Sequence, residues 1–168
     1  AASLPRLPKA KSMKILLLGG TGFLGPQIVE AAQARGHVLT LFNRGKTNPG
    51  LFPDIEKLHG DRDGDLKSLE GRKWDAVVDT SGVVPRLVTM SASLLAPNVN
   101  QYVFISTISV YAGFPNPGMN ETAPVGKVDD ETIEQVTGKS YGPLKALCEQ
   151  AAEKAMPGRV TNIRPGLI

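Results

Sequence analysis

A glycine-rich turn stands between a short apolar run and a helical pattern, and it constrains the fold more than any other feature of this sequence. Residues 13–18 (MKILLL) form the apolar run, and residues 24–35 repeat apolar side chains about once per helical turn. A continuous apolar run of this length is typical of a strand buried on both faces of a parallel sheet. The turn, residues 19–25, reads GGTGFLG. The sequence therefore predicts a strand–turn–helix unit that opens an α/β domain.

The same alternation continues along the chain. We predict strands over 38–42, 55–59, 75–80, 102–106 and 160–163, and helical segments over 66–70, 84–95 and 141–155. Strands that alternate with helices imply right-handed crossovers and a doubly wound parallel sheet. The expected architecture is a three-layer αβα Rossmann fold with strand order 3-2-1-4-5-6, and with a ligand beyond the carboxyl ends of the strands. Residues 112–126, with three prolines and three glycines, are expected to form a long loop.

Composition argues against several classes of partner. The 19 basic and 16 acidic residues are well mixed along the chain and leave a formal charge of +3, which does not favour nucleic acid. No apolar stretch approaches the ~20 residues that span a membrane, so no membrane association is expected. The single cysteine, Cys148, excludes an internal disulfide, and no metal site is predicted. We expect a cytoplasmic protein.

The length of 168 residues fits one domain. Residues 1–12 carry two prolines, several basic residues and no apolar core, and are expected to be a disordered lead-in. Residues 13–168 are expected to form the domain itself. His37, His59, Trp74 and Cys148 are interpreted as structural residues.

The glycines of the turn suit a dinucleotide. Such a turn needs glycine for a tight bend, for backbone approach to a pyrophosphate and for close helix–strand packing. The helix that follows presents free N–H groups and the positive end of its dipole to the phosphates. We therefore predict that Gly19, Gly22, Phe23, Leu24 and Gly25 bind the cofactor. The alternative is a glycine-rich turn that only packs.

The residues at the end of the second strand bear on the choice between NAD and NADP. An NAD site would place an acidic residue here, about 20 residues after the turn, to bind the ribose hydroxyls. This sequence has Asn43 and Arg44 instead. Arginine can pair with a 2′-phosphate through charge-assisted hydrogen bonds, so NADP is favoured and NAD stays open. The alternative is a solvated loop arginine.

A tyrosine and a lysine stand four residues apart in the helix predicted at 141–155. Tyr141 and Lys145 of the segment YGPLK would therefore share one helix face. A nearby positive charge lowers the pKa of a phenol, which can then exchange the proton that accompanies hydride transfer. A chance surface pair of this spacing is common.

Four motifs occur in a fixed order: GGTGFLG, ISTISVY, YGPLK and NIRPG. In this order they resemble the extended short-chain dehydrogenase/reductase family, the NAD(P)-dependent epimerases and dehydratases. The resemblance covers residues 13–168. It implies an enzyme that transfers hydride at a sugar-like carbinol, with NADP or NAD as cofactor and a small-molecule substrate such as a nucleotide sugar.

The resemblance also implies residue roles. Tyr141 would be the acid/base, Lys145 would lower its pKa and bind the ribose, and Thr107 would hydrogen-bond the substrate oxygen, with Ser106 as the alternative. Asp61 and Arg62 would lie beside the adenine. The remaining cofactor contacts would come from Thr80, Ser81, Gly82, Pro165 and Gly166.

Members of the family continue past the RPG motif into a smaller substrate-binding domain. We expect that domain to be absent here, which would leave the substrate site incomplete and expose apolar surface that favours a homodimer. One alternative function is a non-catalytic NAD(P) sensor or scaffold on the same fold. Another is RNA binding, since some plant chloroplast proteins resemble this family, although the balanced charge argues against it.

Overall fold

The strands of the computed structural model form one parallel sheet in the order β3-β2-β1-β4-β5-β6. The structure describes residues 11–114 and 117–167. Its strands are β1 (Lys14–Leu18), β2 (Val38–Asn43), β3 (Glu56–His59), β4 (Trp74–Asp79), β5 (Val99–Ile105) and β6 (Val160–Ile163). The α-helices are α1 (Gly25–Ala34), α2 (Pro85–Leu95) and α3 (Tyr141–Ala155), and the 3-10 turns are η1 (Lys67–Leu69), η2 (Ala96–Asn98) and η3 (Ile108–Val110). The predicted Rossmann architecture and strand order are confirmed.

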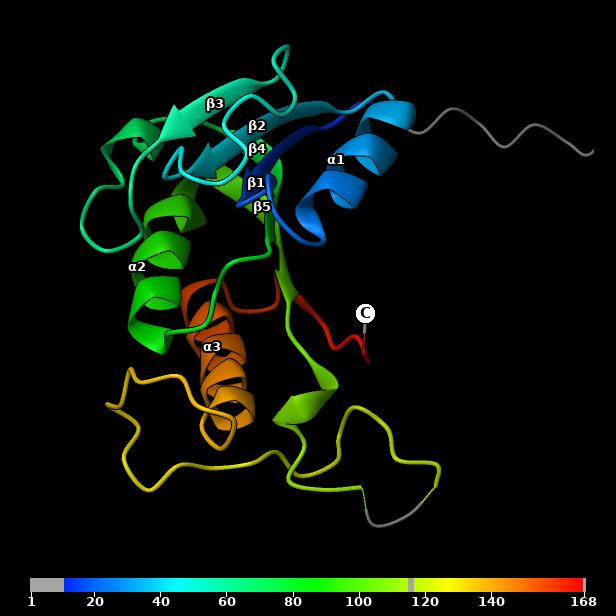
Figure 1. The fold of residues 1–168 in the computed structure, drawn as a ribbon, viewed down its shortest axis with the longest axis vertical. Coiled ribbons are helices and arrows are strands. Elements are labelled where there is room, and N and C mark those ends of the chain that lie inside the picture. Colours follow the sequence, from blue (N-terminus) through cyan, green and yellow to red (C-terminus); the bar gives the residue numbers. More distant parts are fainter. Residues whose placement is uncertain (1–10, 115–116, 168) are drawn as a thin grey trace, which may run out of the picture.

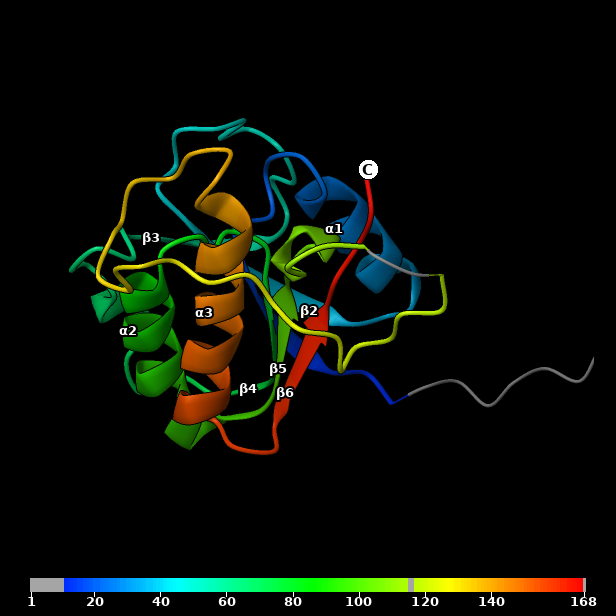
Figure 2. The ribbon, with the colours of Figure 1, turned by 90° about the horizontal axis from the view of Figure 1, so that it is seen from below.

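Helices cover both faces of the sheet, with α1 on one face and α2 and α3 on the other (Figures 1 and 2). The alternation of side chains along β1 explains these layers, because successive residues of a strand point to opposite faces. Leu17 packs with Val29 of α1 in one apolar cluster, whereas Leu16 and Leu18 belong to the other cluster. Each layer of helices therefore has its own core.

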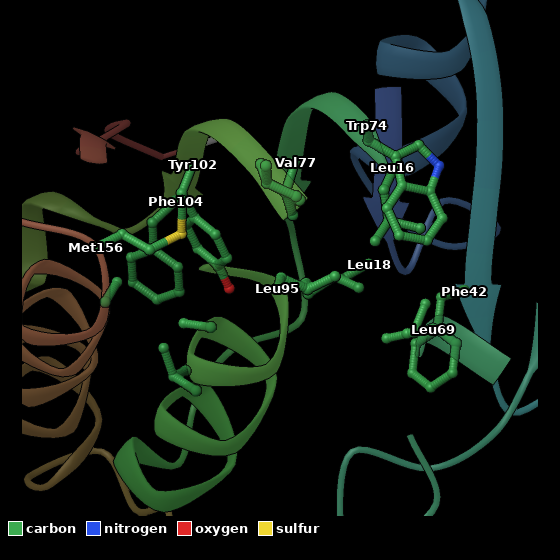
Figure 3. Packing of buried hydrophobic residues seen from close by; sticks show 14 of the residues in the cluster. Leu16, Leu18, Phe42, Leu69, Trp74, Val77, Leu95, Tyr102, Phe104 and Met156 are labelled. Atoms are coloured by element: carbon green, nitrogen blue, oxygen red, sulfur yellow. The ribbon is translucent and has the colours of Figure 1, made fainter. Parts of the chain in front are cut away.

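The larger core lies between the sheet and the α2–α3 layer. Figure 3 shows side chains from β1, β4 and β5 meeting those of the helices, with Tyr102 and Phe104 of β5 among the largest fully buried groups. Trp74 opens β4 in this cluster, and its indole Nε1 donates to Thr40 Oγ1 at 3.2 Å. This packing holds the central strands of the sheet in place. The loops at the carboxyl ends of these strands therefore extend from a well-packed core.

The element bounds agree with the predicted ones to within a residue or so, except that β5 begins at Val99 rather than at 102. The long loop extends further than predicted: apart from the bridge between Tyr111 and Val125, its described residues contain no helix or strand up to 140. The lead-in predicted for residues 1–12 lies largely outside the described residues. Within the described part of the chain, no helix is both long and apolar enough to cross a membrane.

Candidate functional site

A cleft of about 380 Å³ opens at the carboxyl ends of β1, β2 and β4. This is where the strand order reverses direction, the point at which sheets of this kind bind ligands. It contains eight of the residues predicted to bind the cofactor, namely Gly19, Gly22, Asn43, Arg44, Asp61, Arg62, Thr80 and Ser81. The cleft is also lined by Gly20, Thr21, Phe42, Lys46, Thr47, Gly60 and Leu87.

The glycine turn forms one wall of the cleft in a conformation that requires glycine. Gly19 and Gly20 have φ angles of +111° and +95°, in the left-handed region that other residues rarely adopt. A Cβ atom on Gly25 would lie 2.6 Å from the carbonyl carbon and the Cα of Gly20. The absence of a side chain at Gly25 therefore lets the start of α1 pack directly against the turn.

Gly22 differs from these glycines because the protein itself leaves room beside it. Its φ is not positive, and a Cβ atom there would meet only Thr47, at 3.5 Å. Open space beside a glycine, in the wall of a cleft at a helix N-terminus, is the arrangement that close approach of a phosphate requires. The binding of a pyrophosphate by this turn stays a prediction.

The loop after β2 brings two cations to the cleft. The Asn43 side chain anchors this loop, since its Oδ1 accepts from Gly45 N at 2.8 Å and its Nδ2 donates to Gly19 O at 3.4 Å. Arg44 and Lys46 are exposed and line the cleft, and neither forms an ion pair with a carboxylate of the described residues. Lys46 was not predicted from the sequence, although its place two residues after Arg44 was a usable indication.

Arg62 was expected beside the adenine, but its guanidinium points into the protein. It is 9% exposed and makes a bidentate pair with Asp79, both nitrogen–oxygen distances being 2.8 Å. Burial alone would raise the pKa of Asp79, but the charge and hydrogen bonds of Arg62 lower it. Burial likewise opposes the charge of Arg62, and Asp79 more than compensates, so its pKa is raised. The pair is therefore ionised and buried in the floor of the cleft.

The three residues predicted to be catalytic lie outside this cleft, at the start of α3 and the end of β5. Lys145 is 4% exposed, and its Nζ donates to Gly82 O and to Ile105 O, each at 2.7 Å. It also lies 4.1 Å from the centre of the Phe104 ring. Burial lowers the pKa of Lys145. Its ammonium thus joins the loop that follows β4 to the end of β5, with one of its three protons uncommitted.

Thr107 and Tyr141 come from segments that pack closely together. The Thr107 hydroxyl caps η3, where it accepts from Ser109 N at 3.1 Å and donates to Ser109 Oγ at 3.2 Å. A Cβ atom on Gly142, the second residue of α3, would collide with the carbonyl oxygen of Ser109. In the described residues no hydrogen bond joins Tyr141 to Thr107 or Lys145, so their joint role stays a prediction.

Several other residues predicted to bind the cofactor do not line the cleft. Phe23 is 78% exposed and has a φ of +49°. Leu24 caps α1. Gly82 is packed against Phe104, and the carbonyl of Pro165 accepts from Ile108 N at 3.0 Å. Their direct contact with a cofactor is not seen and stays a prediction.

The thiol of Cys148 is expected to be unreactive in the folded protein. Cys148 is fully buried on α3, and burial raises the pKa of its thiol to about 12. The reactive thiolate is therefore almost absent at pH 8. We expect a thiol reagent at pH 8 to modify no cysteine in the native protein and one per chain after denaturation in guanidinium. Stoichiometric labelling of the folded protein would contradict this burial.

Comparisons with known proteins show which solved structures share this fold. No protein-family model matches the chain. The NAD complex of the Bordetella bronchiseptica enzyme WbmG superimposes with a TM-score of 0.73 at 18% identity, over 94% of this chain and 54% of that one. The UDP-N-acetylglucosamine 4-epimerase from Bacillus cereus gives 0.67 at 24% identity, over 91% and 53% of the two chains. The chain shares the fold of these two enzymes, which confirms the fold that the resemblance predicts.

Two curated proteins are similar in sequence. The chloroplast stem-loop binding protein of 41 kDa b from Arabidopsis thaliana is 31% identical over 163 residues, covering 78% of this chain and 43% of that protein. The dTDP-6-deoxy-L-talose 4-dehydrogenase (NAD(P)(+)) of Kitasatospora kifunensis is 26% identical over 176 residues, covering 93% and 52%. The chain thus spans about half the length of the curated relatives it matches.

Proposed function

We propose that this domain binds NADP or NAD in the cleft and supports hydride transfer at a sugar-like carbinol. The glycine turn is the main support for this proposal. Gly19 and Gly20 have positive φ angles, Gly25 packs against the backbone of Gly20, and the space beside Gly22 is open. The neighbouring WbmG structure is a complex with NAD, and the talose dehydrogenase is named as an NAD(P)(+) enzyme. Both support a nicotinamide dinucleotide as the ligand.

The two cations after β2 support a preference for NADP. A 2′-phosphate carries charge that ribose hydroxyls lack, and charge-assisted hydrogen bonds are stronger than neutral ones. Arg44 and Lys46 line the cleft with no carboxylate of the described residues to neutralise them. The loop carries no acidic side chain between residues 43 and 48 that would accept from ribose hydroxyls. These features favour the phosphorylated cofactor.

Replacing Arg44 tests the cofactor assignment. We expect Arg44→Ala to weaken NADPH binding about 10- to 100-fold, since one hydrogen-bonded charge contributes roughly 1.5–3 kcal/mol. NADH binding should change little. Nucleotide fluorescence titration measures both, and Arg35→Ala, which removes an exposed arginine of similar charge next to α1, serves as the control. Equal binding of NADH and NADPH by the parent protein would refute the NADP preference, and binding of neither would refute the function.

The proposed chemistry uses three side chains of this chain. The nicotinamide cofactor, when bound, supplies the hydride acceptor or donor. Tyr141 removes or returns the hydroxyl proton of the substrate, and Thr107 donates a hydrogen bond to the same oxygen in place of the one that it donates to Ser109 Oγ. Lys145 places a positive charge near Tyr141 and has a proton left for a ribose hydroxyl, since its other two bind Gly82 O and Ile105 O. A positioned acid/base of this kind contributes about 10²–10⁴-fold to rate.

A nucleotide sugar is the proposed substrate class. The similar structures include UDP-sugar epimerases, and the talose dehydrogenase is named for a dTDP-sugar. Those proteins are about twice as long as this chain, so we propose that the residues present here supply the cofactor half of the site.

The proposed substrate class is tested by incubating the protein with NADP and with UDP- or dTDP-hexoses, and then measuring NADPH absorbance and analysing the sugars. Tyr141→Phe should abolish turnover and leave NADPH binding unchanged.

RNA binding is the second candidate, favoured by the name of the plant relative at 31% identity. The formal charge of +3 gives it little electrostatic support. A gel shift with a stem-loop RNA at several salt concentrations tests it. A salt-dependent shift without dinucleotide binding would favour this function over the proposed one.

A further inference from the structure

The loop between β3 and η1 lines the cleft through Gly60, Asp61 and Arg62. Asp61 and Asp65 close it by two mutual backbone hydrogen bonds of 3.0 and 2.9 Å, and Asp63 N donates to Asp61 Oδ1 at 3.0 Å. Of the four side chains from 61 to 65, only that of Arg62 is buried. Arg62 therefore provides the buried attachment of this loop, while Asp63 adds an exposed ion pair with Arg86 of α2 at 2.8 Å.

The attachment point is Asp79, the last residue of β4. Arg62 binds both carboxylate oxygens, and its Nη2 also donates to Ser91 Oγ of α2 at 2.7 Å. Asp79 is fully buried and accepts three further hydrogen bonds, from Tyr102 Oη at 2.7 Å, from Ser81 N at 3.0 Å and from Ser81 Oγ at 3.5 Å. One carboxylate thus joins the loop after β3 to β5 and to the turn after β4, and its arginine partner extends the connection to α2.

Stability alone does not account for this pair. Taking two charges out of water costs more than their attraction returns in many proteins, and an apolar pair of similar volume is often as stable. What the pair does provide is a fixed distance between Asp61 and the turn Thr80–Ser81, which line the same cleft. Nη1 of Arg62 also donates to Ser81 Oγ at 3.3 Å, so the guanidinium contacts the turn after β4 directly.

We propose that Arg62 and Asp79 are positioning residues that preset the adenosine side of the dinucleotide cleft. This inference rests on the proposed function. Neither side chain is assigned a contact with the ligand: the pair acts through the loop 61–65 and the turn 80–81, holding them at the spacing that the bound cofactor needs. The loop 61–65 and the turn 80–81 are therefore ordered before the cofactor binds, and the binding free energy includes no cost for ordering them.

Neutralising both partners together tests the proposal without leaving one buried charge unpaired. We expect Arg62→Gln/Asp79→Asn to bind NADPH and the fragment 2′-phospho-AMP at least tenfold more weakly, measured at a temperature where the variant is fully folded. The matched control is Arg72→Gln/Glu56→Gln, which neutralises an exposed pair at the amino ends of β3 and β4 with contacts of 2.6 and 2.7 Å. The control should bind both ligands as the parent does.

Hydrogen exchange on the parent protein gives a test that does not depend on the variant folding. If the loop 61–65 is ordered before the cofactor binds, the amides of Asp61 and Asp65 are protected from exchange without ligand, and NADPH changes their exchange rates less than twofold. A large gain in protection on binding would overturn the proposal, as would parental affinity in the folded double variant. Absence of dinucleotide binding by the parent would instead refute the proposed function, so the two failures are distinguishable.

Discussion

Gly25→Ala is expected to damage both the fold and cofactor binding, because its new methyl group would lie 2.6 Å from backbone atoms of Gly20. Backbone cannot yield as a flexible side chain does, so the start of α1 or the turn must move. Overpacking of this kind costs about 1–3 kcal/mol. For a domain of this size that lowers the melting temperature by roughly 2–12 °C. NADPH affinity should fall with it, since the turn is the proposed pyrophosphate site.

Gly22→Ala is expected to weaken cofactor binding without destabilising the fold. The free protein has room for this methyl group, whose nearest neighbour is Thr47 at 3.5 Å, so the melting temperature should stay within a degree or so of the parent's. The same methyl group would stand between the backbone and the pyrophosphate, and we expect NADPH affinity to fall at least about tenfold. Gly50→Ala, at an open position in the loop after β2, is the control. Undiminished affinity in Gly22→Ala would show that the ligand does not approach this wall.

Gly142→Ala is expected to have its largest effect on turnover. The methyl group would collide with the carbonyl oxygen of Ser109, forcing the first turn of α3 away from η3. Those two segments carry Tyr141 and Thr107, and misplacing reacting groups by about 1 Å can cost 10²-fold in rate. We expect turnover to fall about 100-fold while NADPH binding is retained, because Gly142 does not line the cleft.

Gly138→Ala is the matched control for this prediction, since Gly138 is exposed and open on all sides. Steady-state kinetics with a nucleotide sugar and fluorescence titration with NADPH are the two measurements. Equal turnover in both variants would mean that the contact between α3 and η3 has no part in the chemistry. A parallel loss of cofactor binding in Gly142→Ala would place Tyr141 closer to the cofactor site than proposed.

The fold could be predicted from the sequence because its evidence is local. An apolar run such as residues 14–18 and a glycine turn such as 19–25 specify their own structure, and the alternation of strands with helices then limits the topology to few choices. The helix at 141–155 was bounded correctly for the same reason, since the apolar pattern of its sequence shows where it begins and ends. The 3-10 turn at Ile108–Val110 was not predicted, because three residues carry no periodic pattern.

The side-chain environments at the site could not be predicted in the same way. The partners Arg62 and Asp79 are 17 residues apart; Arg62 follows β3 and Asp79 ends β4, and these strands are separated in the sheet by β2 and β1. An aspartate directly after the apolar run 76–78 was the local indication that a buried cation was needed there. Lys145 is similar: its spacing from Tyr141 suggested a shared open face, whereas its ammonium is committed to two carbonyl oxygens.

The position of β1 in the middle of the sheet has a consequence for how the chain is made. β1 pairs with β2 on one side and with β4 on the other, and Leu16, Leu17 and Leu18 are fully buried only when both neighbours are present. β4 ends at Asp79, so a ribosome must release some sixty more residues before the first strand can be enclosed. Pairings between distant segments form slowly, and an unpaired apolar strand edge invites association with other chains. During synthesis, β1 therefore stays open to association with other chains until β4 has been made.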